Sequence, residues 1–364
     1  MKKINFFIPN FHAGGAERVC INLANDLSTR HLVTLYVNEN VGPMKYELGD
    51  NIDVKELHYR KAFANILQIR RILKSNVDAY NVVFLTHQIL VVLIASTGLG
   101  LNRMIVSERN DLIKDLAGLP ILKRYIFTKL IRIYYPKADK IICVSEGVLN
   151  SVAKVSGCSD NLVTIYNPVI GNSTHRLSEE SLPVHVENIV YGRKVILTVG
   201  RLEDQKNHKL LINAFAKFHE DFSDSVLLIA GEGSNKKQLE NQIKQLKLGK
   251  SVYLLGYVEN PFPLFSRADC FVLSSNFEGL PGVLIQALAY SKNVIATDCE
   301  SGPREILKDG ALGQLVRTGD ELGLKNAMMK VFKNQVNSVK FTDRDLERFG
   351  IAGNINKYEE IITQ

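Results

Sequence analysis

The sequence contains no apolar run long enough to cross a membrane. A transmembrane helix needs roughly 18 or more consecutive, mostly apolar residues, and the apolar stretches of these 364 residues are shorter. The N-terminus, KKINFFIPN, leads directly into a predicted strand and then a polar loop, which is not the pattern of a secretory leader. We therefore expect a soluble, cytoplasmic chain.

Signatures of metal ions and dinucleotide cofactors are also missing. The five cysteines are Cys20, Cys143, Cys158, Cys270 and Cys299. They lack the close spacing of a metal site, and we expect reduced thiols. The Asp-x-Asp pair Asp343 and Asp345 follows Thr342 at a predicted helix start, where capping explains it better than metal binding. The first glycine turn lacks GxGxxG, the nicotinamide-cofactor fingerprint. The sequence thus predicts neither a metal nor a cofactor.

Acidic residues are outnumbered by basic ones only in the N-terminal half. The formal net charge is +7, and residues 1–168 hold 21 Lys and Arg against 14 Asp and Glu, whereas the remainder holds 24 of each. Such an excess suits an anionic partner, either nucleic acid or a membrane surface. No recognisable nucleic-acid-binding module accompanies the charge. We therefore expect no nucleic-acid partner.

Predicted strands and helices alternate along most of the chain, which indicates parallel α/β sheets. The length and a hydrophobic content of 46% fit two globular domains. The alternation weakens between Ile170 and Gly192 and restarts at Val195. We predict doubly wound, Rossmann-like domains over 1–168 and 193–342, a loop-like hinge over 169–192 and a helical tail over 343–364. Ligands of such sheets lie beyond the carboxyl ends of the strands.

The stretch FVLSSNFEGLPGVLIQAL, from Phe271 to Leu288, reads as a buried strand, a polar turn and a helix. The turn places the carboxylate of Glu278 beside Gly279 and the first amides of the helix. A carboxylate there accepts hydrogen bonds from sugar hydroxyls, and unpaired amides favour phosphate oxygens. Taken alone, the stretch fits equally well an ordinary strand-to-helix turn with Glu278 as a first-turn charge.

A second stretch, VILTVGRLEDQKNH, repeats this pattern upstream. Its strand ends at Gly200, and a loop carries Arg201 and Lys206 to the start of a helix. The forked guanidinium binds oxygens in pairs and the ammonium supplies a point charge. Together the two side chains suit a diphosphate.

The sequence GRLxxxKN followed by FEGLPxVLxxAL resembles the retaining glycosyltransferases of family 4, whose fold is named GT-B. The resemblance implies two Rossmann-like domains facing across a cleft, with a final helix that crosses back to the first domain. It implies sugar transfer from a nucleotide diphosphate sugar without an obligatory metal or a covalent enzyme intermediate. Arg201 and Lys206 would neutralise charge on the leaving diphosphate. Glu278, with the Gly279 and Leu280 amides, would hold the sugar.

One position departs from the family pattern. A second glutamate is expected eight residues after the first, near the ribose hydroxyls, and this chain has Gln286 there. Glutamine still donates to and accepts from a diol, but it lacks the charge that strengthens the contact about twofold. We expect weaker ribose binding, and the departure leaves a catalytically silent homologue open.

Other glycine turns lie where the resemblance places the donor. Gly14 and Gly15 precede a helix in PNFHAGGAER, and the GEG turn carries Gly231 and Gly233. Each of these turns also fits plain turn geometry. The predicted donor-binding set is Gly14, Gly15, Gly200, Gly231, Gly233, Tyr257, Gly279, Leu280 and Gln286.

Polar residues at the strand ends of the first domain are candidates for acceptor contacts. The strand ending at Ser107 is followed by ERND, which resembles a subgroup containing hexosamine and galactose transferases. Glu108 could contact a sugar hydroxyl or the reacting centre, Arg109 could meet an acceptor phosphate, and either could merely pair with the other. His12 could contact a ligand or be a solvated loop residue.

The segment LPILKRYIFTKLIRIYYP combines an apolar stripe with basic and aromatic side chains. Leu122, Ile126, Leu130 and Ile133 recur at helical spacing, and we expect this stripe to pack on the sheet. The charged face, with Tyr125, Tyr134 and Tyr135 beside it, suits an anionic membrane surface, where each cation contributes roughly 1 kcal/mol. The basic residues of that face are Lys123, Arg124, Lys129 and Arg132.

The resemblance, together with the charged side chains of the two motif loops, implies a retaining hexosyltransferase that uses a nucleotide diphosphate sugar, with UDP as the expected nucleotide. The donor sugar would be galactose or an N-acetylhexosamine, and the acceptor a lipid-linked saccharide at the inner face of a bacterial membrane. A nucleotide-sugar epimerase of the same fold, a silent UDP-binding homologue and a nucleic-acid binder are the alternatives.

Overall fold

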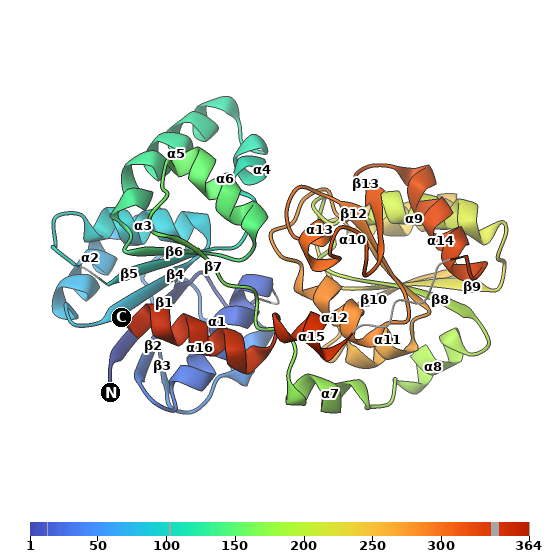
Figure 1. Cartoon of the computed structure of the whole chain (residues 1–364), viewed down its shortest axis with the longest axis horizontal. Helices are drawn as coiled ribbons and strands as arrows, with labels where there is room; N and C mark the ends of the chain where they lie inside the picture. Colours follow the sequence, from blue (N-terminus) through green and yellow to red (C-terminus); the bar gives the residue numbers. More distant parts are fainter. Residues whose placement is uncertain (13, 102, 336–341, 364) are drawn as a thin grey trace. The chain divides into compact units, whose positions relative to one another are not determined.

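The computed structural model describes residues 1–12, 14–101, 103–335 and 342–363 (Figure 1). Contacts divide the chain into two compact units, Met1–Pro168 with Ile351–Gln364 and Val169–Gly350. Each unit contains one sheet with helices on both faces. The prediction of two doubly wound α/β domains is therefore confirmed.

The first unit is built on a seven-stranded parallel sheet in the order β3-β2-β1-β4-β5-β6-β7. Its strands are β1 (Lys3–Ile8), β2 (Leu32–Val37), β3 (Ile52–Glu56), β4 (Tyr80–Phe84), β5 (Met104–Glu108), β6 (Lys140–Cys143) and β7 (Leu162–Thr164). Its α-helices are α1 (Gly15–Leu27), α2 (Ile66–Ser75), α3 (Thr86–Ser96), α4 (Leu112–Ala117), α5 (Ile121–Tyr134), α6 (Glu146–Ser156) and α16 (Ile351–Thr363). Short 3-10 turns are η1 (Pro43–Glu47), η2 (Ala62–Asn65) and η3 (Tyr135–Lys137).

Alternation along the strands decides which face each helix covers. Ile4, Phe6 and Ile8 of β1 belong to a buried cluster with the apolar faces of α1 and α16, because successive strand side chains point to opposite faces. Helices α2 and α3 pack together, and α3, α4 and α6 contact α5. Polar side chains at the strand ends are thus held by a closely packed scaffold.

The second unit repeats this architecture with a six-stranded parallel sheet in the order β10-β9-β8-β11-β12-β13. Its strands are β8 (Lys194–Val199), β9 (Ser225–Ala230), β10 (Val252–Gly256), β11 (Cys270–Leu273), β12 (Val294–Asp298) and β13 (Gln314–Arg317). Its helices are α7 (Asn172–Ser178), α8 (Val184–Val190), α9 (His208–His219), α10 (Lys236–Gln245), α11 (Phe262–Arg267), α12 (Gly282–Tyr290), α13 (Pro303–Ile306), α14 (Glu321–Phe332) and α15 (Asp343–Glu347). The apolar faces of α9, α10 and α14 bury one side of the sheet.

Residues 169–192, expected to be a loop-like hinge, instead form α7 and α8 within the second unit. Tyr290 Oη donates a hydrogen bond to Thr174 Oγ1 at 2.9 Å, and Asn260 Nδ2 donates to the Leu177 carbonyl at 2.9 Å. Val186 and Val190 of α8 are buried. Helices of seven residues need few buried positions, so their periodicity is weak in the sequence.

The tail, expected to be one helical segment over 343–364, is divided between the units. Helix α15 belongs to the second unit and α16 to the first. Thr342 caps α15, and its backbone N–H donates to the Asp345 carboxylate at 2.9 Å. The interpretation of this Asp-x-Asp pair as part of a cap is confirmed at Asp345.

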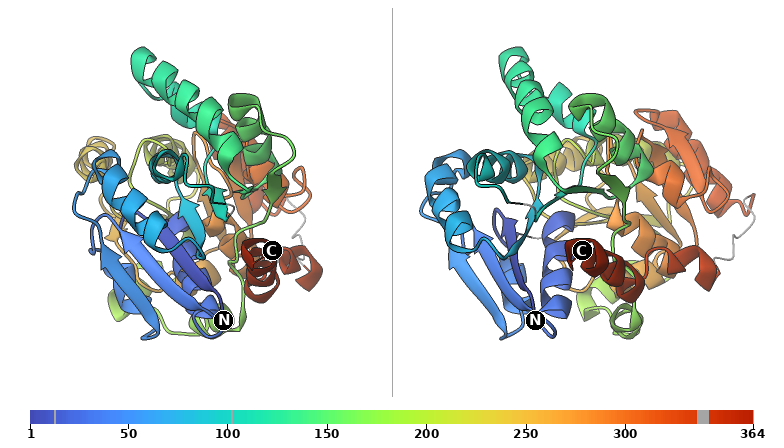
Figure 2. Two further views of the ribbon diagram at one scale, coloured as in Figure 1. Left: turned by 90° about the vertical axis from the view of Figure 1, so that its left-hand side faces the viewer. Right: turned by 60° about the vertical axis from the view of Figure 1, so that its left-hand side comes forward.

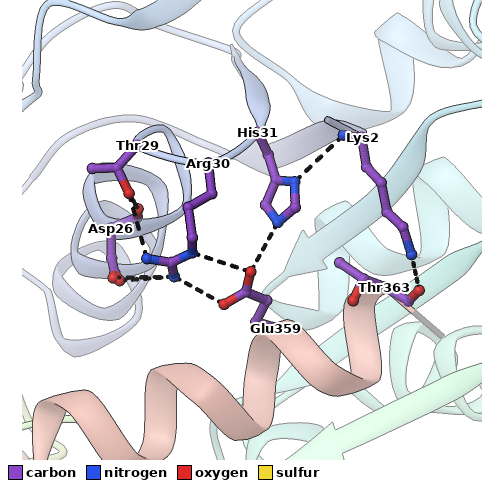
Figure 3. A network of polar contacts seen from close by, with 7 residues as sticks. All are labelled: Lys2, Asp26, Thr29, Arg30, His31, Glu359 and Thr363. Atoms are coloured by element: carbon purple, nitrogen blue, oxygen red, sulfur yellow. Dashed lines mark hydrogen bonds and ion pairs between the residues drawn. The ribbon is translucent and has the colours of Figure 1, made fainter.

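Helix α16 packs beside α1 and β4 (Figures 1 and 2). The exposed side of α16 takes part in a polar network (Figure 3). In it, Glu359 accepts a hydrogen bond from Arg30 Nη2 at 2.8 Å and contacts His31 Nε2 at 2.9 Å. The Arg30 guanidinium, followed by His31, holds the pKa of the Glu359 carboxyl below its usual range. Exposed pairs contribute roughly 0–1 kcal/mol each, so burial of Ile355, Tyr358 and Ile362 holds the helix in place.

Candidate active site

The two motif loops of the second unit lie against each other. The loop after β8 and the loop after β11 are joined by hydrogen bonds: Asn276 N donates to the Gln205 carbonyl at 2.8 Å, and Gln205 Nε2 donates to the Phe277 carbonyl at 3.0 Å. Ser274 Oγ donates to the Lys206 carbonyl at 2.9 Å. Strands β8 and β11 are neighbours in the sheet, so their carboxyl ends bring the motifs together.

Lys206 and Glu278 form an ion pair at the centre of this junction. The distance from Lys206 Nζ to Glu278 Oε1 is 2.6 Å, and their side chains are 14% and 6% exposed. Ser275 Oγ donates to the same oxygen at 2.6 Å. Within the described residues both bonds end on Oε1, so Oε2 keeps its capacity to accept from a ligand hydroxyl.

Glycine 200 makes room for the lysine. A Cβ at this position would lie 3.2 Å from Lys206 Cε, closer than ordinary van der Waals contact. The aliphatic part of the Lys206 side chain therefore packs against Gly200, in the space that a side chain at position 200 would occupy. This is a packing role for Gly200, beside the donor contact that the sequence suggests.

Gly231 and Gly233 perform a similar function between neighbouring loops. A Cβ on Gly231, whose φ is +143°, would lie 2.0 Å from the Gly200 carbonyl oxygen. A Cβ on Gly233 would lie 2.5 Å from the Leu202 carbonyl oxygen. Gly231 N donates to the Gly256 carbonyl at 2.7 Å. The loops after β8, β9 and β10 thus pack backbone against backbone, and these two glycines are required for that contact.

The other predicted donor residues lie on the loops and the helix that follow strands β8, β10 and β11. Arg201 is exposed, and its Nη2 donates to Gln205 Oε1 at 3.3 Å. Leu280 is buried at the turn before α12, and Gln286 is half-buried on that helix. Tyr257 is 41% exposed directly after β10. The residues predicted to bind the diphosphate, the sugar and the ribose therefore all lie on segments that follow parallel strands of the second sheet.

The first unit places the glycine loop at the carboxyl end of β1. Gly14 is the N-cap residue of α1, and a Cβ there would lie 2.1 Å from Glu17 Oε2. Gly15 has no atom within 4 Å of its Cβ position among those described. His12 is exposed, and its N–H donates to Asn10 Oδ1 at 3.1 Å. The Glu17 carboxylate is the end of a flexible side chain and can move away, so packing requires glycine at neither Gly14 nor Gly15.

Glu108 lies in the interior of the first unit. Its side chain is 1% exposed, Thr86 Oγ1 donates to Oε1 at 2.8 Å, and Tyr135 Oη donates to Oε2 at 2.5 Å. Burial raises the pKa of the Glu108 carboxyl to about 7. Glu108 therefore joins β5, the start of α3 and the turn after α5, and it forms no ion pair with Arg109 among the described contacts.

A pH-dependent stability follows from the buried Glu108. Between about pH 4.5 and 7 the folded chain keeps a proton on Glu108 that the unfolded chain has released, so the free energy of unfolding falls as pH rises through this interval. Glu108→Gln cannot ionise, and we expect it to gain stability relative to the wild type by up to about 3 kcal/mol above pH 7. Urea unfolding at pH 5 and pH 8 measures the difference.

Glu240→Gln provides the matched control for this experiment, because Glu240 is exposed on α10. It should follow the pH dependence of the wild type. A Glu108→Gln profile parallel to that of the wild type would show that the Glu108 carboxyl titrates normally.

Arg109 is also buried and does not pair with Glu108. The side chain is 7% exposed, Nη2 donates to Asn167 Oδ1 at 2.5 Å, and Nη1 donates to Tyr358 Oη at 3.1 Å. Asp111, in the same SERND segment, caps α4 by accepting from the Ile113 and Lys114 amides. The sequence indicated that this segment lies at a strand end, but not that its side chains turn inward.

The expectation that the apolar stripe of α5 packs on the sheet is wrong. Leu122 is 71% exposed, Ile126 and Ile133 are also exposed, and Leu130 is half-buried. Among the residues of α5, Ile131 is buried. The helix packs on α3, α4 and α6, and its first turns extend beyond these helices, so the apolar side chains there remain exposed (Figure 2). Tyr135, assigned to the charged face, is fully buried against Glu108. Lys123, Arg124, Lys129 and Arg132 are exposed as expected.

Two polar residues that support the site were not singled out in the sequence. Ser275 binds Glu278, and Gln205 links Arg201 to the carbonyl of Phe277. Both lie inside the motif loops. The signal in the sequence that could have identified them is that each is an uncharged polar residue close to a predicted ligand-binding residue.

Other expectations concern cofactors and membranes. All five cysteines are buried and free of disulfides. The described residues contain no group of three or more His, Cys, Asp or Glu side chains arranged to hold a metal ion. Within the same residues, no helix has the length and apolar character needed to cross a bilayer.

Comparison with known proteins identifies the family of this chain. The profile of "Glycosyl transferases group 1" matches residues 185–348, and that of "Glycosyltransferase Family 4" matches residues 13–170. The N-acetylgalactosamine-N,N'-diacetylbacillosaminyl-diphospho-undecaprenol 4-alpha-N-acetylgalactosaminyltransferase of Campylobacter jejuni is 30% identical over 98% of this chain and 99% of its own. A second Campylobacter jejuni enzyme, a GalNAc-alpha-(1->4)-GalNAc-alpha-(1->3)-diNAcBac-PP-undecaprenol alpha-1,4-N-acetyl-D-galactosaminyltransferase, is 29% identical over 95% of both chains.

Solved structures share the fold. Anabaena HepE in complex with UDP-glucose superposes over 100% of both chains with a TM-score of 0.81 at 19% identity. Sucrose-phosphate synthase from Thermosynechococcus elongatus covers 100% of this chain and 99% of its own, with a TM-score of 0.79 at 16% identity. With the two profile matches and the relative at 30% identity over nearly the whole chain, the protein belongs to the family 4 glycosyltransferases of the GT-B fold.

Proposed function

We propose that the protein transfers a hexose or N-acetylhexosamine from a UDP-sugar to a lipid-linked saccharide with retention of anomeric configuration. The observation that carries the proposal is the Lys206–Glu278 pair, which joins the two motif loops at the carboxyl edge of the second sheet. Its ammonium suits a diphosphate, and its carboxylate suits sugar hydroxyls. The second unit would bind the donor and the first unit the acceptor.

In the proposed reaction, the bond between the anomeric carbon and the β-phosphate oxygen breaks while the acceptor hydroxyl attacks the same face of the sugar. The acceptor proton passes to the departing phosphate oxygen, so no enzyme base is needed. Arg201 and Lys206 stabilise the charge that develops on that phosphate. Glu278 Oε2 and the amides at Gly279 and Leu280 hold the sugar, and Gln286 holds the ribose. We propose that the step needs neither a metal nor a cofactor.

The substrate class rests on the relatives. Names of the two Campylobacter enzymes specify N-acetylgalactosamine transfer to undecaprenol-diphosphate saccharides, and two less similar relatives are lipopolysaccharide 1,6-galactosyltransferases. We therefore propose UDP-N-acetylgalactosamine or UDP-galactose as donor, a polyprenyl-diphosphate saccharide as acceptor, and a role in assembling a bacterial surface polysaccharide such as capsule or O-antigen.

The decisive experiment offers UDP-N-acetylgalactosamine or UDP-galactose with and without a polyprenyl-diphosphate saccharide, in the presence of a metal chelator. UDP release should depend on the acceptor, and NMR of the product should show the anomeric configuration of the donor. Isomerised UDP-sugar formed without an acceptor would instead establish an epimerase. UDP binding without any turnover would establish a silent homologue.

We propose that α5 binds an anionic membrane surface at the cytoplasmic face, where a lipid-linked acceptor lies. Lys123, Arg124 and Lys129 project from the helix beside exposed Leu122 and Tyr125, a combination that suits the lipid headgroup region. The exposed apolar side chains support this assignment more strongly than a charged face alone would.

Vesicle binding tests the role of α5. We expect Lys123→Gln with Arg124→Gln to weaken binding to vesicles containing phosphatidylglycerol by about 30-fold, because each cation near the surface contributes roughly 1 kcal/mol. Co-sedimentation measures the change. Arg71→Gln with Lys74→Gln on α2 removes the same charge from another exposed helix of the first unit and should change binding less. An equal loss in both pairs would show that only net charge matters.

A further inference from the structure

The chain passes between the two units twice, and the two passages are tied together on each side. The first follows Pro168 and the second follows Gly350. In the second unit, Val169 N and Ile170 N both donate to the Phe349 carbonyl, at 2.9 and 3.1 Å. Ile170 and Gly350 also form a parallel bridge. The outgoing and returning segments are therefore one paired element at that side.

Arg109 makes the corresponding connection in the first unit. Its Nη2 reaches Asn167, the residue before Pro168, and its Nη1 reaches Tyr358 on α16, the helix that follows the second passage. Nη1 also donates to Ser107 Oγ at 3.3 Å at the end of β5. One guanidinium thus holds the departing segment, the returning helix and the strand end that carries the SERND segment.

This arrangement is enclosed and contains no counter-charge in the described structure. Ser107 and Tyr358 are 0% exposed and Asn167 is 6% exposed, and among the described residues the ion pairs include none to Arg109. A buried charge held by neutral acceptors is unfavourable compared with an apolar core of the same shape. Stability alone therefore does not explain an arginine at this position. The planar guanidinium has donors fixed in two directions, which suits a residue that bonds to two separate segments of the chain.

The same contacts argue against an anion site at Arg109. Both terminal nitrogens already donate to protein oxygens, and the side chain is 7% exposed. An acceptor phosphate would have to displace Asn167 or Tyr358 from bonds buried in the core. Lys123 and Arg124 on α5 are exposed and need no such displacement.

We propose that Arg109 is a positioning residue that binds the two connecting segments to the acceptor-side strand β5 and so sets how the first unit approaches the donor during transfer. The proposal rests on the proposed function, because transfer requires an acceptor on one unit and a donor on the other. A loosened connection lowers the fraction of productive encounters, which reduces turnover without altering nucleotide affinity.

The test compares Arg109→Gln and Tyr358→Phe with the wild type and with Arg103→Gln. Arg103 lies just before β5, where it donates to the Asp78 carbonyl and its guanidinium lies 4.7 Å from the Tyr80 ring centroid, away from both passages. Three readouts are needed: amide hydrogen exchange over 165–170 and 349–358, calorimetric UDP affinity, and the ratio of acceptor transfer to UDP-sugar hydrolysis.

We expect Arg109→Gln to raise exchange over both segments, to lower transfer kcat by about tenfold or more and to leave UDP affinity within about twofold. Tyr358→Phe removes one hydroxyl and should give a smaller change in the same direction, so it decides the matter if Arg109→Gln does not fold. Arg103→Gln should match the wild type.

Two results would overturn the proposal. A raised acceptor KM with unchanged kcat and unchanged exchange would assign Arg109 to acceptor phosphate. If Arg103→Gln changes hydrogen exchange and transfer kcat as much as Arg109→Gln does, the loss of any arginine near β5 has the same effect, and Arg109 has no specific positioning role. If the wild type transfers no sugar, the proposed function fails, and exchange over the two segments still tests the link made by Arg109.

Discussion

Lys206→Ala is expected to lower the rate of sugar transfer by roughly 10²–10³-fold at saturating donor, because in the proposed reaction Lys206 stabilises developing charge, and loss of a single such group has this size of effect. It will also weaken UDP binding by about tenfold or more, since a charge-assisted contact contributes about 1.5–3 kcal/mol. The ammonium is 2.6 Å from Glu278 Oε1 and its side chain is 14% exposed. Initial rates and calorimetric titration with UDP measure the two effects.

The same substitution will destabilise the second unit. Glu278 is 5% exposed, and without the ammonium its carboxylate keeps the hydrogen bond from Ser275 but no cation in the described contacts. Removing one partner of a buried pair costs about 3–5 kcal/mol, and we expect about 3 kcal/mol because the lysine is partly exposed. Urea unfolding of the second-unit transition measures the loss.

Two further variants separate charge from structure. Lys206→Arg keeps the positive charge and should retain most UDP affinity while losing part of the rate. Glu278→Gln with Lys206→Met removes both charges at similar volume, and it should recover stability relative to Lys206→Ala without recovering activity. If Lys206→Ala unfolds like the wild type, the pair contributes no stability and Glu278 is exposed to solvent in solution.

The motif loops could be predicted from the sequence because strand ends fix the position of the residues that follow them. Parallel strands present their carboxyl ends at one edge, so Arg201, Lys206 and Glu278 were expected to gather there. The direct pairing of Lys206 with Glu278 was not expected. It depends on Gly200 and on hydrogen bonds between the loops, and neither follows from spacing.

For the SERND segment, the position at a strand end could be predicted from the sequence, but the direction of its side chains could not. A strand end predicts an exposed edge, but Glu108 and Arg109 turn into the core because Tyr135, Asn167 and Tyr358 lie there. These partners are 27, 58 and 249 residues away in the chain, and no local pattern links them. The exposed stripe of α5 has the same origin, since helical spacing identifies an apolar face but not the element that it meets.

Gly231→Ala should be among the most damaging single-methyl changes in the second unit. Its φ of +143° is unfavourable for an L side chain, and the added Cβ would lie 2.0 Å from the Gly200 carbonyl oxygen. Strained backbone costs about 1–3 kcal/mol, and overpacking a further 1–3 kcal/mol or so. We expect the free energy of unfolding to fall by at least about 3 kcal/mol.

We also expect Gly231→Ala to lower UDP affinity by about tenfold or more. Relief of the clash would displace Gly200 and the loop that carries Arg201 and Lys206. Gly249→Ala is the matched control: Gly249 is an exposed glycine of the same unit whose added Cβ meets no described atom within 4 Å, so stability and affinity should remain within about 1 kcal/mol of the wild type. A Gly231→Ala protein that unfolds like the wild type yet binds UDP poorly would contradict the packing argument. It would mean that Gly231 is needed for close approach of the nucleotide itself, which is the role its place in the GEG turn first suggested.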